Sequence, residues 1–308
     1  MTTPKHFLDV SEISATELNG ILHNASTMKQ ARLGKPRGMV EKNRPLDGRI
    51  LAMIFERPST RTRVSFDVAI RQMGGEPLVL SAGDMQIGRG ETIADTARVL
   101  SRFVDAIMIR SAHHETLLEL AEHAEIPVIN GLTDLSHPCQ VMADVLTLQE
   151  KKGTLKGLTV AWSGDSCNMT TSWIHAAQRF GFAMRVASPE GYQPPAAVMQ
   201  WAQDHQVDLV VTTSPQEAVQ GADCVVTDTW ASMNVTDSES RHRELAPYQV
   251  TGSLMKHANN KAIFMHCLPA HRGEEVTAEV MDGPQSVVFD EAENRIHAQK
   301  AILQWCMT

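Results

Sequence analysis

The sequence predicts an α/β protein of two domains, each a mostly parallel sheet flanked by helices. The chain has 308 residues, enough for two hydrophobic cores. Short apolar runs alternate with stretches of helical spacing, and this alternation implies parallel strands joined by right-handed crossovers. The segment Gly-Thr-Leu-Lys-Gly, 153–157, interrupts the series and marks a domain edge. We therefore expect a first domain over residues 1–150, a second over 151–290 and a closing helix over 291–308.

The first domain is expected to begin with a helix-rich lead-in up to about residue 45, with a capped helix start between Ser11 and Glu17. Apolar runs then predict strands, and amphipathic stretches predict helices between them. The strands are expected at 50–55, 77–81, 106–109 and 127–130, and the helices at 59–73, 92–103, 114–123 and 138–151.

The second domain repeats the alternation, and its strands are expected at 158–162, 184–187, 209–211, 224–227 and 262–266. A turn, 163–168, and a helix to about Phe180 follow its first strand. No G-x-G-x-x-G sequence opens a helix, so the sequence does not support dinucleotide binding.

Composition narrows the classes of partner. The net charge of −8 leaves no broad basic face for a nucleic-acid backbone, whereas local arginine pairs suit a small anion. No apolar stretch has the length that crosses a bilayer, and the first residues lack the apolar core of a signal peptide. The five cysteines are scattered and form no C-x-x-C pair, which is typical of a reducing compartment. We expect a cytoplasmic protein that binds neither nucleic acid nor membrane.

The stretch Phe55-Glu-Arg-Pro-Ser-Thr-Arg-Thr-Arg63 is the strongest local signal of function. It joins the end of a predicted strand to the start of a helix. The first turn of a helix offers unpaired N–H groups and a positive dipole end, and here it also carries hydroxyl and guanidinium donors. A capped helix with solvated arginines is the simpler interpretation. The combination of strand, turn and donors favours a phosphate site.

Other polar side chains follow the carboxyl ends of predicted strands, where ligands of open α/β sheets bind. Each of them alone is more simply a cap, a surface charge or core packing, but their shared edge favours a site. They are Arg110, His137, Gln140, Asn168, Asp228 and Cys267.

Metal binding is a further alternative. His266 and Cys267 with His271, or His137 with Cys139, are conceivable zinc ligands, but their spacing matches none of the usual structural zinc patterns. We expect no metal and no organic cofactor.

Four segments together resemble the aspartate/ornithine transcarbamylases, and most closely their ornithine branch. They are Ser-Thr-Arg-Thr-Arg (59–63), His-Pro-Cys-Gln (137–140), Asp-Thr-Trp-Ala-Ser-Met (228–233) and His-Cys-Leu-Pro (266–269). The resemblance covers essentially the whole chain. It implies a carbamoyl phosphate domain, an amino-acid domain, a closing helix that packs back on the first domain, and assembly as a homotrimer.

The resemblance also implies roles for single residues. The carbamoyl phosphate set would be Ser59, Thr60, Arg61, Thr62, Arg110, His137, Gln140, Cys267, Leu268 and Arg295, and the ornithine set would be Asn168, Asp228, Ser232 and Met233. Arg110 and His137 would stabilise the oxyanion, while Asp228 and Cys267 would orient the attacking amine and help its deprotonation. The implied reaction transfers the carbamoyl group of carbamoyl phosphate to the δ-amino group of L-ornithine, giving L-citrulline and phosphate in arginine metabolism.

The amino-acid half departs from the family pattern. Ornithine enzymes usually carry Gly-Asp-Gly-Asn-Asn where this chain has Gly164-Asp-Ser-Cys-Asn168, and Ser-Met-Gly where it has Ser232-Met-Asn234. Ser166 would be unfavourable if its position requires positive φ. A transcarbamylase with another amine acceptor and a carbamoyl phosphate-binding protein with little turnover therefore stay as alternatives. Aspartate is disfavoured as acceptor, because that branch has Pro-Leu-Pro in place of Cys267-Leu-Pro269.

Overall fold

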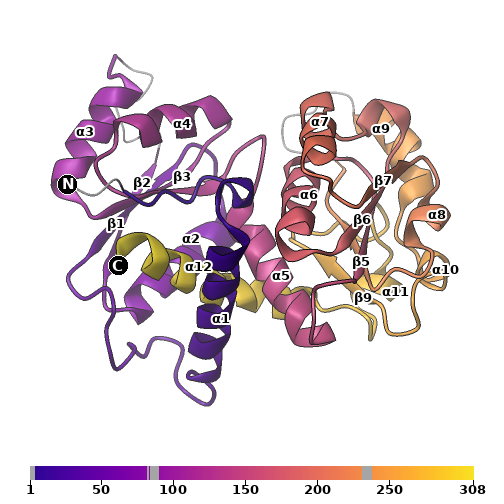
Figure 1. Ribbon diagram of the computed structural model, residues 1–308, viewed down its shortest axis with the longest axis horizontal. Helices are drawn as coiled ribbons and strands as arrows, with labels where there is room; N and C mark the ends of the chain where they lie inside the picture. The colour runs from indigo at the N-terminus through magenta and orange to yellow at the C-terminus, as the bar shows by residue number, and fades with distance from the viewer. Residues whose placement is uncertain (1–3, 82, 84–89, 231–237) are drawn as a thin grey trace. The chain divides into compact units, whose positions relative to one another are not determined.

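The computed structural model describes residues 4–81, 83, 90–230 and 238–308 (Figure 1). The chain divides into two compact units. Unit 1 comprises Met1–Ala143 and Asn294–Thr308, and unit 2 comprises Asp144–Glu293. None of the described helices is long and apolar enough to cross a bilayer.

Unit 1 contains a four-stranded parallel sheet in the order β2-β1-β3-β4. Its strands are β1 (Ile50–Phe55), β2 (Glu76–Ser81), β3 (Ala106–Arg110) and β4 (Val128–Leu132). Its helices are η1 (Val10–Glu12), α1 (Ala15–Gln30), α2 (Thr60–Gln72), α3 (Ile93–Phe103) and α4 (His114–His123), together with the beginning of α5 (Pro138–Lys152) and most of α12 (Val288–Met307).

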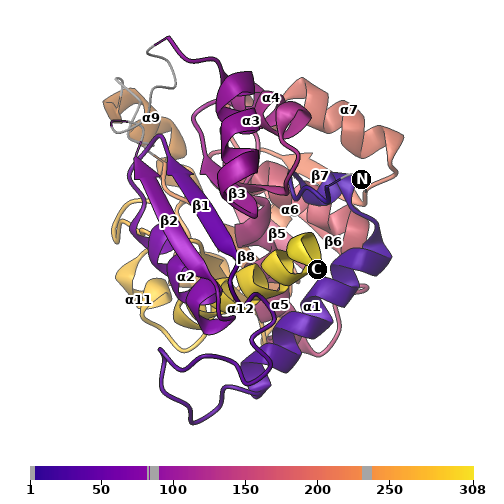
Figure 2. The ribbon, with the colours of Figure 1, turned by 90° about the vertical axis from the view of Figure 1, so that its left-hand side faces the viewer.

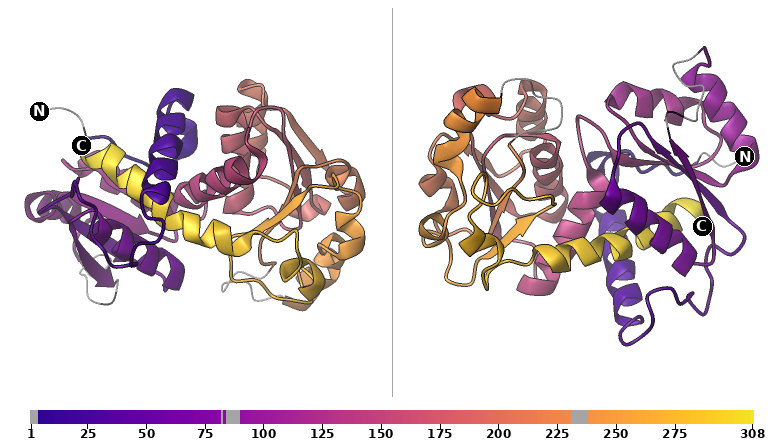
Figure 3. Two further views of the ribbon diagram at one scale, coloured as in Figure 1. Left: turned by 90° about the horizontal axis from the view of Figure 1, so that it is seen from below. Right: turned by 180° about the vertical axis from the view of Figure 1, so that it is seen from behind.

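Helices cover both faces of this sheet because its central strands are apolar along their length (Figure 2). One face, with Ile54 and Ile107, packs on α3 and α4. On the other side lie α2 and the C-terminal part of α12. In α12, Asn294 accepts a hydrogen bond from the Lys29 ammonium of α1 at 2.8 Å, and Figure 3 shows this part of α12 passing beside α1. The closing helix therefore packs on the first unit, as predicted.

Unit 2 contains a five-stranded parallel sheet in the order β7-β6-β5-β8-β9. Its strands are β5 (Thr159–Ser163), β6 (Ala183–Ala187), β7 (Leu209–Thr212), β8 (Cys224–Thr227) and β9 (Ile263–His266). Its further elements are α6 (Asn168–Phe180), η3 (Glu190–Tyr192), α7 (Ala196–Asp204), α8 (Pro215–Val219), α9 (Ser238–Leu245), η4 (Ala246–Tyr248), α10 (Gly252–Met255) and α11 (Ala278–Met281).

The core of unit 2 lies on both faces of its sheet. On one face, Val225 of β8 and Phe264 of β9 share a buried cluster with side chains of α8, α10 and α11. Trp173 of α6 makes an edge contact with Phe182, with ring centroids 5.8 Å apart. The predicted fold class, two parallel sheets flanked by helices, is confirmed. The strand ends that carry the predicted functional residues are those of β1, β3 and β4 in unit 1 and of β5, β8 and β9 in unit 2.

Candidate functional site

The predicted phosphate motif forms the start of α2 in unit 1. Ser59 is the N-cap, and its hydroxyl accepts a hydrogen bond from the Thr62 N–H at 3.3 Å. Ser59 and Thr60 line a pocket of about 590 Å³ together with Arg57 and Arg63. Neither arginine was among the predicted site residues, although both belong to the same motif. The pocket thus combines a helix start, two hydroxyl groups and two guanidinium groups, an arrangement that suits an anion.

Thr62, the third residue of α2, forms hydrogen bonds with two distant parts of the chain. Its side-chain oxygen accepts a hydrogen bond from Arg295 Nη2 at 2.8 Å and a longer one from Arg110 Nη1 at 3.4 Å. Arg295 Nη1 also donates to Gln140 Oε1 at 2.8 Å. Thr62, Gln140 and Arg295 are almost fully buried. The structure therefore brings α2, β3, α5 and α12 together around two guanidinium groups.

His137 lies at the edge of this cluster, just before α5, and it is buried. Burial lowers the pKa of His137 well below its usual value, and the positive charges of Arg295, Arg110 and Arg61 lower it further. The imidazole is therefore neutral at physiological pH and offers one N–H donor. Because all three arginines act on His137, the predicted residues Arg61, Arg110, His137 and Arg295 belong to one electropositive site.

In unit 2, the turn between β5 and α6 is the first predicted part of the amino-acid site. Gly164 adopts φ +131°, and a Cβ there would lie 3.2 Å from both Thr227 Oγ1 and Trp230 Nε1, so this position requires glycine. Ser166 does not have positive φ, and its hydroxyl lies 2.9 Å from the hydroxyl of Ser188. The serine is thus compatible with the turn. Asn168 begins α6 directly after it.

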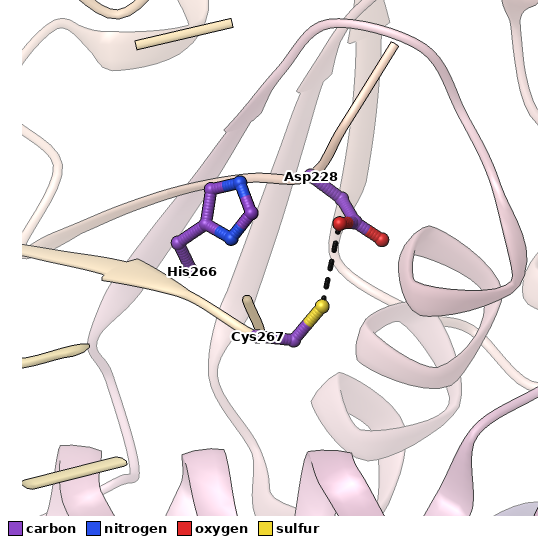
Figure 4. A group of neighbouring side chains, drawn as sticks. All are labelled: Asp228, His266 and Cys267. Carbon is purple, nitrogen blue, oxygen red and sulfur yellow. Dashed lines mark hydrogen bonds between the residues drawn. The ribbon is translucent and has the colours of Figure 1, made fainter. Parts of the chain in front are cut away.

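Asp228 directly follows β8, and its carboxylate accepts hydrogen bonds from two cysteine thiols. Cys267 Sγ donates to Asp228 Oδ1 at 3.3 Å (Figure 4), and Cys167 Sγ donates to Oδ2 at 3.7 Å. The Thr229 N–H also donates to Oδ1, at 2.8 Å. Burial and the negative charge of Asp228 raise the pKa of both thiols well above their usual value. Both thiols therefore stay protonated and donate their hydrogen bonds to the Asp228 carboxylate.

His266 lies beside Asp228 and Cys267 (Figure 4). One potential ligand atom of each of these three residues lies within 4.8 Å of the other two, which is close enough to hold a metal ion. Its ring nitrogens are already engaged, however. Nδ1 accepts a hydrogen bond from the Leu268 N–H at 2.9 Å, which leaves Nε2 as the donor to Glu275 Oε1 at 3.2 Å. These two hydrogen bonds of His266 connect Glu275 to the loop that follows β9. In this loop Leu268 adopts φ +61°, a left-handed conformation that leucine rarely takes. Strained backbone of this kind is concentrated at functional sites.

Asp165 lies in the β5–α6 turn and pairs with Arg241 of α9. The pKa of Asp165 is raised to about 6, chiefly by burial and in part by the negative charge of Asp228, against the lowering effect of Arg241. Arg241 also lies over the ring of Tyr192, 4.8 Å from its centroid. This pair connects the turn that carries Cys167 and Asn168 to α9.

Two of the predicted ornithine residues, Ser232 and Met233, lie outside the described residues, as does Asn234. In unit 1, hydrogen bonds and charges connect Arg61, Thr62, Arg110, His137, Gln140 and Arg295, and Ser59 and Thr60 lie at the same helix start; we call this set the unit 1 cluster. In unit 2, a hydrogen bond connects Asp228 with Cys267, Leu268 follows Cys267 in the chain and Asn168 follows Cys167; we call these four predicted residues the unit 2 cluster. Sequence reasoning missed Cys167 as a partner of Asp228, because their 61 residues of separation carry no periodic signal.

The fold and the two clusters define a two-domain α/β protein that has an arginine-rich cluster in one unit and a carboxylate–thiol cluster in the other. Family models match both halves. Residues 5–150 match the aspartate/ornithine carbamoyltransferase carbamoyl-P binding domain, and residues 156–306 match the Asp/Orn binding domain of the same family. The chain therefore belongs to the aspartate/ornithine carbamoyltransferase family.

Individual relatives agree with this membership. The chain is 60% identical over 304 residues to an ornithine carbamoyltransferase of Bradyrhizobium diazoefficiens, covering 99% of this chain and 97% of the relative. It is 59% identical to one of Brucella ovis, covering 98% and 96%. Among solved structures, the ornithine carbamoyltransferase of Pyrococcus furiosus superposes with a TM-score of 0.93 at 48% identity, covering 99% of this chain and 97% of that one.

Proposed function

We propose that the protein is an ornithine carbamoyltransferase, which transfers the carbamoyl group of carbamoyl phosphate to the δ-amino group of L-ornithine and releases L-citrulline and phosphate. The observation that carries the proposal is the identity of 60% to an ornithine carbamoyltransferase over almost the whole chain. The two clusters supply the chemistry that this reaction needs, in the units whose family models are named for carbamoyl phosphate and for the amino acid.

The unit 1 cluster binds carbamoyl phosphate in this proposal. The start of α2, with Ser59, Thr60 and Arg61, holds the phosphate dianion and stabilises it as the leaving group. Arg110 and His137 donate to the carbonyl oxygen, where negative charge develops as the amine attacks. A preorganised donor of this kind contributes about 3 to 4 kcal/mol to transition-state stabilisation. The neutral state of His137 suits this role, because its N–H donates without placing another full positive charge beside the arginines.

The unit 2 cluster binds and prepares the amine. Free ornithine carries a protonated side-chain amine with a pKa near that of lysine, ~10.4, and the attacking nitrogen must be neutral. Asp228 accepts hydrogen bonds from the substrate and is the group that takes the proton. The protonated Cys267 and Cys167 orient its carboxylate through their hydrogen bonds. Asn168, Ser232 and Met233 complete the amino-acid site, and holding both substrates together supplies much of the acceleration.

Arg61→Ala tests the phosphate assignment. We expect loss of carbamoyl phosphate binding, measured by isothermal titration, because the helix start loses the guanidinium group that neutralises the dianion. Arg71→Ala is the matched control, since Arg71 lies at the opposite end of α2 in an exposed ion pair with Asp67. Wild-type binding by Arg61→Ala would contradict the assignment.

A second candidate function is transfer to a different amine. The observation that favours it is Cys167, which donates to Asp228 from a position where ornithine enzymes usually carry asparagine. One assay separates the candidates, in which the protein receives carbamoyl phosphate with ornithine, N-acylornithine, putrescine or aspartate in turn. Citrulline as the main product supports ornithine, another ureido product supports the second candidate, and binding without any product supports a carbamoyl phosphate-binding protein.

We also propose a homotrimer in the cytoplasm. The family resemblance supports the assembly, and the cysteine usage supports the compartment. Light scattering coupled to size-exclusion chromatography checks the assembly, for which a chain of 33.9 kDa should give three times that mass.

A further inference from the structure

A second cluster of metal-binding side chains lies in unit 2, outside the residues to which we assign substrates. It is formed by His271, Glu274 and Glu275, in the loop between β9 and α11. One ligand atom from each residue lies within 4.8 Å of the others. His271 Nδ1 is 3.6 Å from Glu274 Oε2 and 3.9 Å from Glu275 Oε2.

These separations approach those of a coordination sphere. Zinc binds histidine nitrogen and carboxylate oxygen at about 2.0 to 2.2 Å, which places tetrahedral ligand atoms roughly 3.3 to 3.6 Å apart. The two distances from His271 Nδ1, 3.6 and 3.9 Å, need a contraction of only a few tenths of an ångström, and the ligand atoms of the two glutamates lie within 4.8 Å of each other. One imidazole and two carboxylates form a ligand set that zinc and similar divalent transition metals accept.

Glu275 supplies an independent observation that points to a cation. Its side chain has 0% exposure. Its Oε1 accepts hydrogen bonds from the backbone N–H of His271 at 2.6 Å and from the His266 ring nitrogen Nε2 at 3.2 Å. Its Oε2 is buried and has no hydrogen-bond partner among the described residues. Buried carboxylate oxygens are almost always satisfied, and a cation beside His271 would satisfy this one.

A neighbouring histidine and partial exposure to solvent also suit this cluster to a metal ion. His242 of α9 places Nε2 2.9 Å from Glu274 Oε2, so it orients that carboxylate in the way that outer histidine–carboxylate pairs support metal ligands. The side chains of His271 and Glu274 are 45% and 41% exposed, which gives an ion a path from solvent and leaves room for water ligands.

We propose that His271, Glu274 and Glu275 bind a zinc-like divalent metal ion, with His242 orienting Glu274 and water completing the coordination. The site departs from the expectation that the protein binds no metal, and it does not depend on the proposed transferase activity. Glu275 also contacts His266, whose Nδ1 accepts from the Leu268 N–H. A bound ion therefore fixes the loop that carries Cys267 and Leu268.

The test is a titration of the tag-free full-length chain with Zn²⁺ in competition with a chromophoric chelator. All proteins carry Cys267→Ser, which removes the thiol of the other possible metal cluster. The parent should bind one equivalent, and His271→Ala and Glu274→Gln should lose it. His242→Ala should weaken binding by about 10- to 100-fold, as loss of an outer partner does. His23→Ala, an exposed histidine of α1, is the matched control and should bind as the parent does.

A second measurement separates lost binding from lost folding. Zn²⁺ should raise the thermal unfolding temperature of the parent and of His23→Ala, and should leave that of His271→Ala unchanged, while all three unfold at similar temperatures without metal. Absence of Zn²⁺ binding by the parent would overturn the proposal and leave the cluster as an ion pair of His271 with two carboxylates. Equal binding by the parent, His271→Ala and Glu274→Gln would overturn it as well, since the ion would then lie elsewhere.

Discussion

Thr62→Val removes the hydroxyl group that joins Arg110 and Arg295. Thr62 is 1% exposed, and valine has a similar size, so the substitution changes hydrogen bonding more than packing. The 2.8 Å bond from Arg295 is charge-assisted, and such bonds contribute about 1.5 to 3 kcal/mol. The 3.4 Å bond from Arg110 is long and adds little. We expect the free energy of unfolding to fall by about 1.5 to 3 kcal/mol, mostly through the loss of the hydrogen bond from Arg295 to Thr62.

Urea denaturation of the two proteins measures this difference, and repeating it with saturating inorganic phosphate adds a functional readout. Phosphate offers the guanidinium groups new acceptors, so it should stabilise Thr62→Val at least as much as the wild type. Thr154→Val, at an exposed position outside the cluster, is the control and should change the unfolding free energy by less than about 0.5 kcal/mol. An unfolding free energy of Thr62→Val within that same range would refute the reasoning.

Three further predictions concern unit 2. Asp228→Asn should lower kcat/KM for ornithine by about 10²- to 10⁴-fold, as loss of an acid–base group does, while the Kd of carbamoyl phosphate stays unchanged in titration calorimetry. The raised pKa of Asp165 means that its contribution to stability is present below the unfolded value of 3.8 and is lost as the pH rises through about 6. The unfolding free energy of the wild type relative to Asp165→Asn should therefore fall by about 3 kcal/mol between pH 3 and pH 7, and a flat difference would exclude the raised pKa. Cys267 should react with iodoacetamide at pH 7.5 far more slowly in the native protein than in the denatured one, because its thiol stays protonated. Peptide mapping by mass spectrometry gives both rates, and equal rates would contradict the protonated state.

Local sequence patterns predicted several strands and helices of both units. The apolar run 50–55 is β1, the run 224–227 is β8, and the helical spacing of 114–123 is α4, each with the expected bounds. These patterns succeed because burial of a parallel strand on both faces requires an uninterrupted apolar run, which is visible without knowing its neighbours. Ser59 is the N-cap of α2, as its position before a helical pattern predicted. The short helices α8, α10 and α11 were not predicted, since four or five residues are too few to show helical periodicity.

By itself the sequence determined the two-sheet fold, the start of α2 as a candidate anion site and, through four motifs, the family. The tertiary structure alone decided which groups interact across long separations in the chain. Arg295 reaches Thr62 across 233 residues, and Cys167 reaches Asp228 across 61. The protonation states of His137 and Cys267 also depend on it, because burial and neighbouring charges set them. Such contacts and fields arise only when folding brings helices and strand ends that are distant in the chain next to one another, and no local pattern of residues records that arrangement.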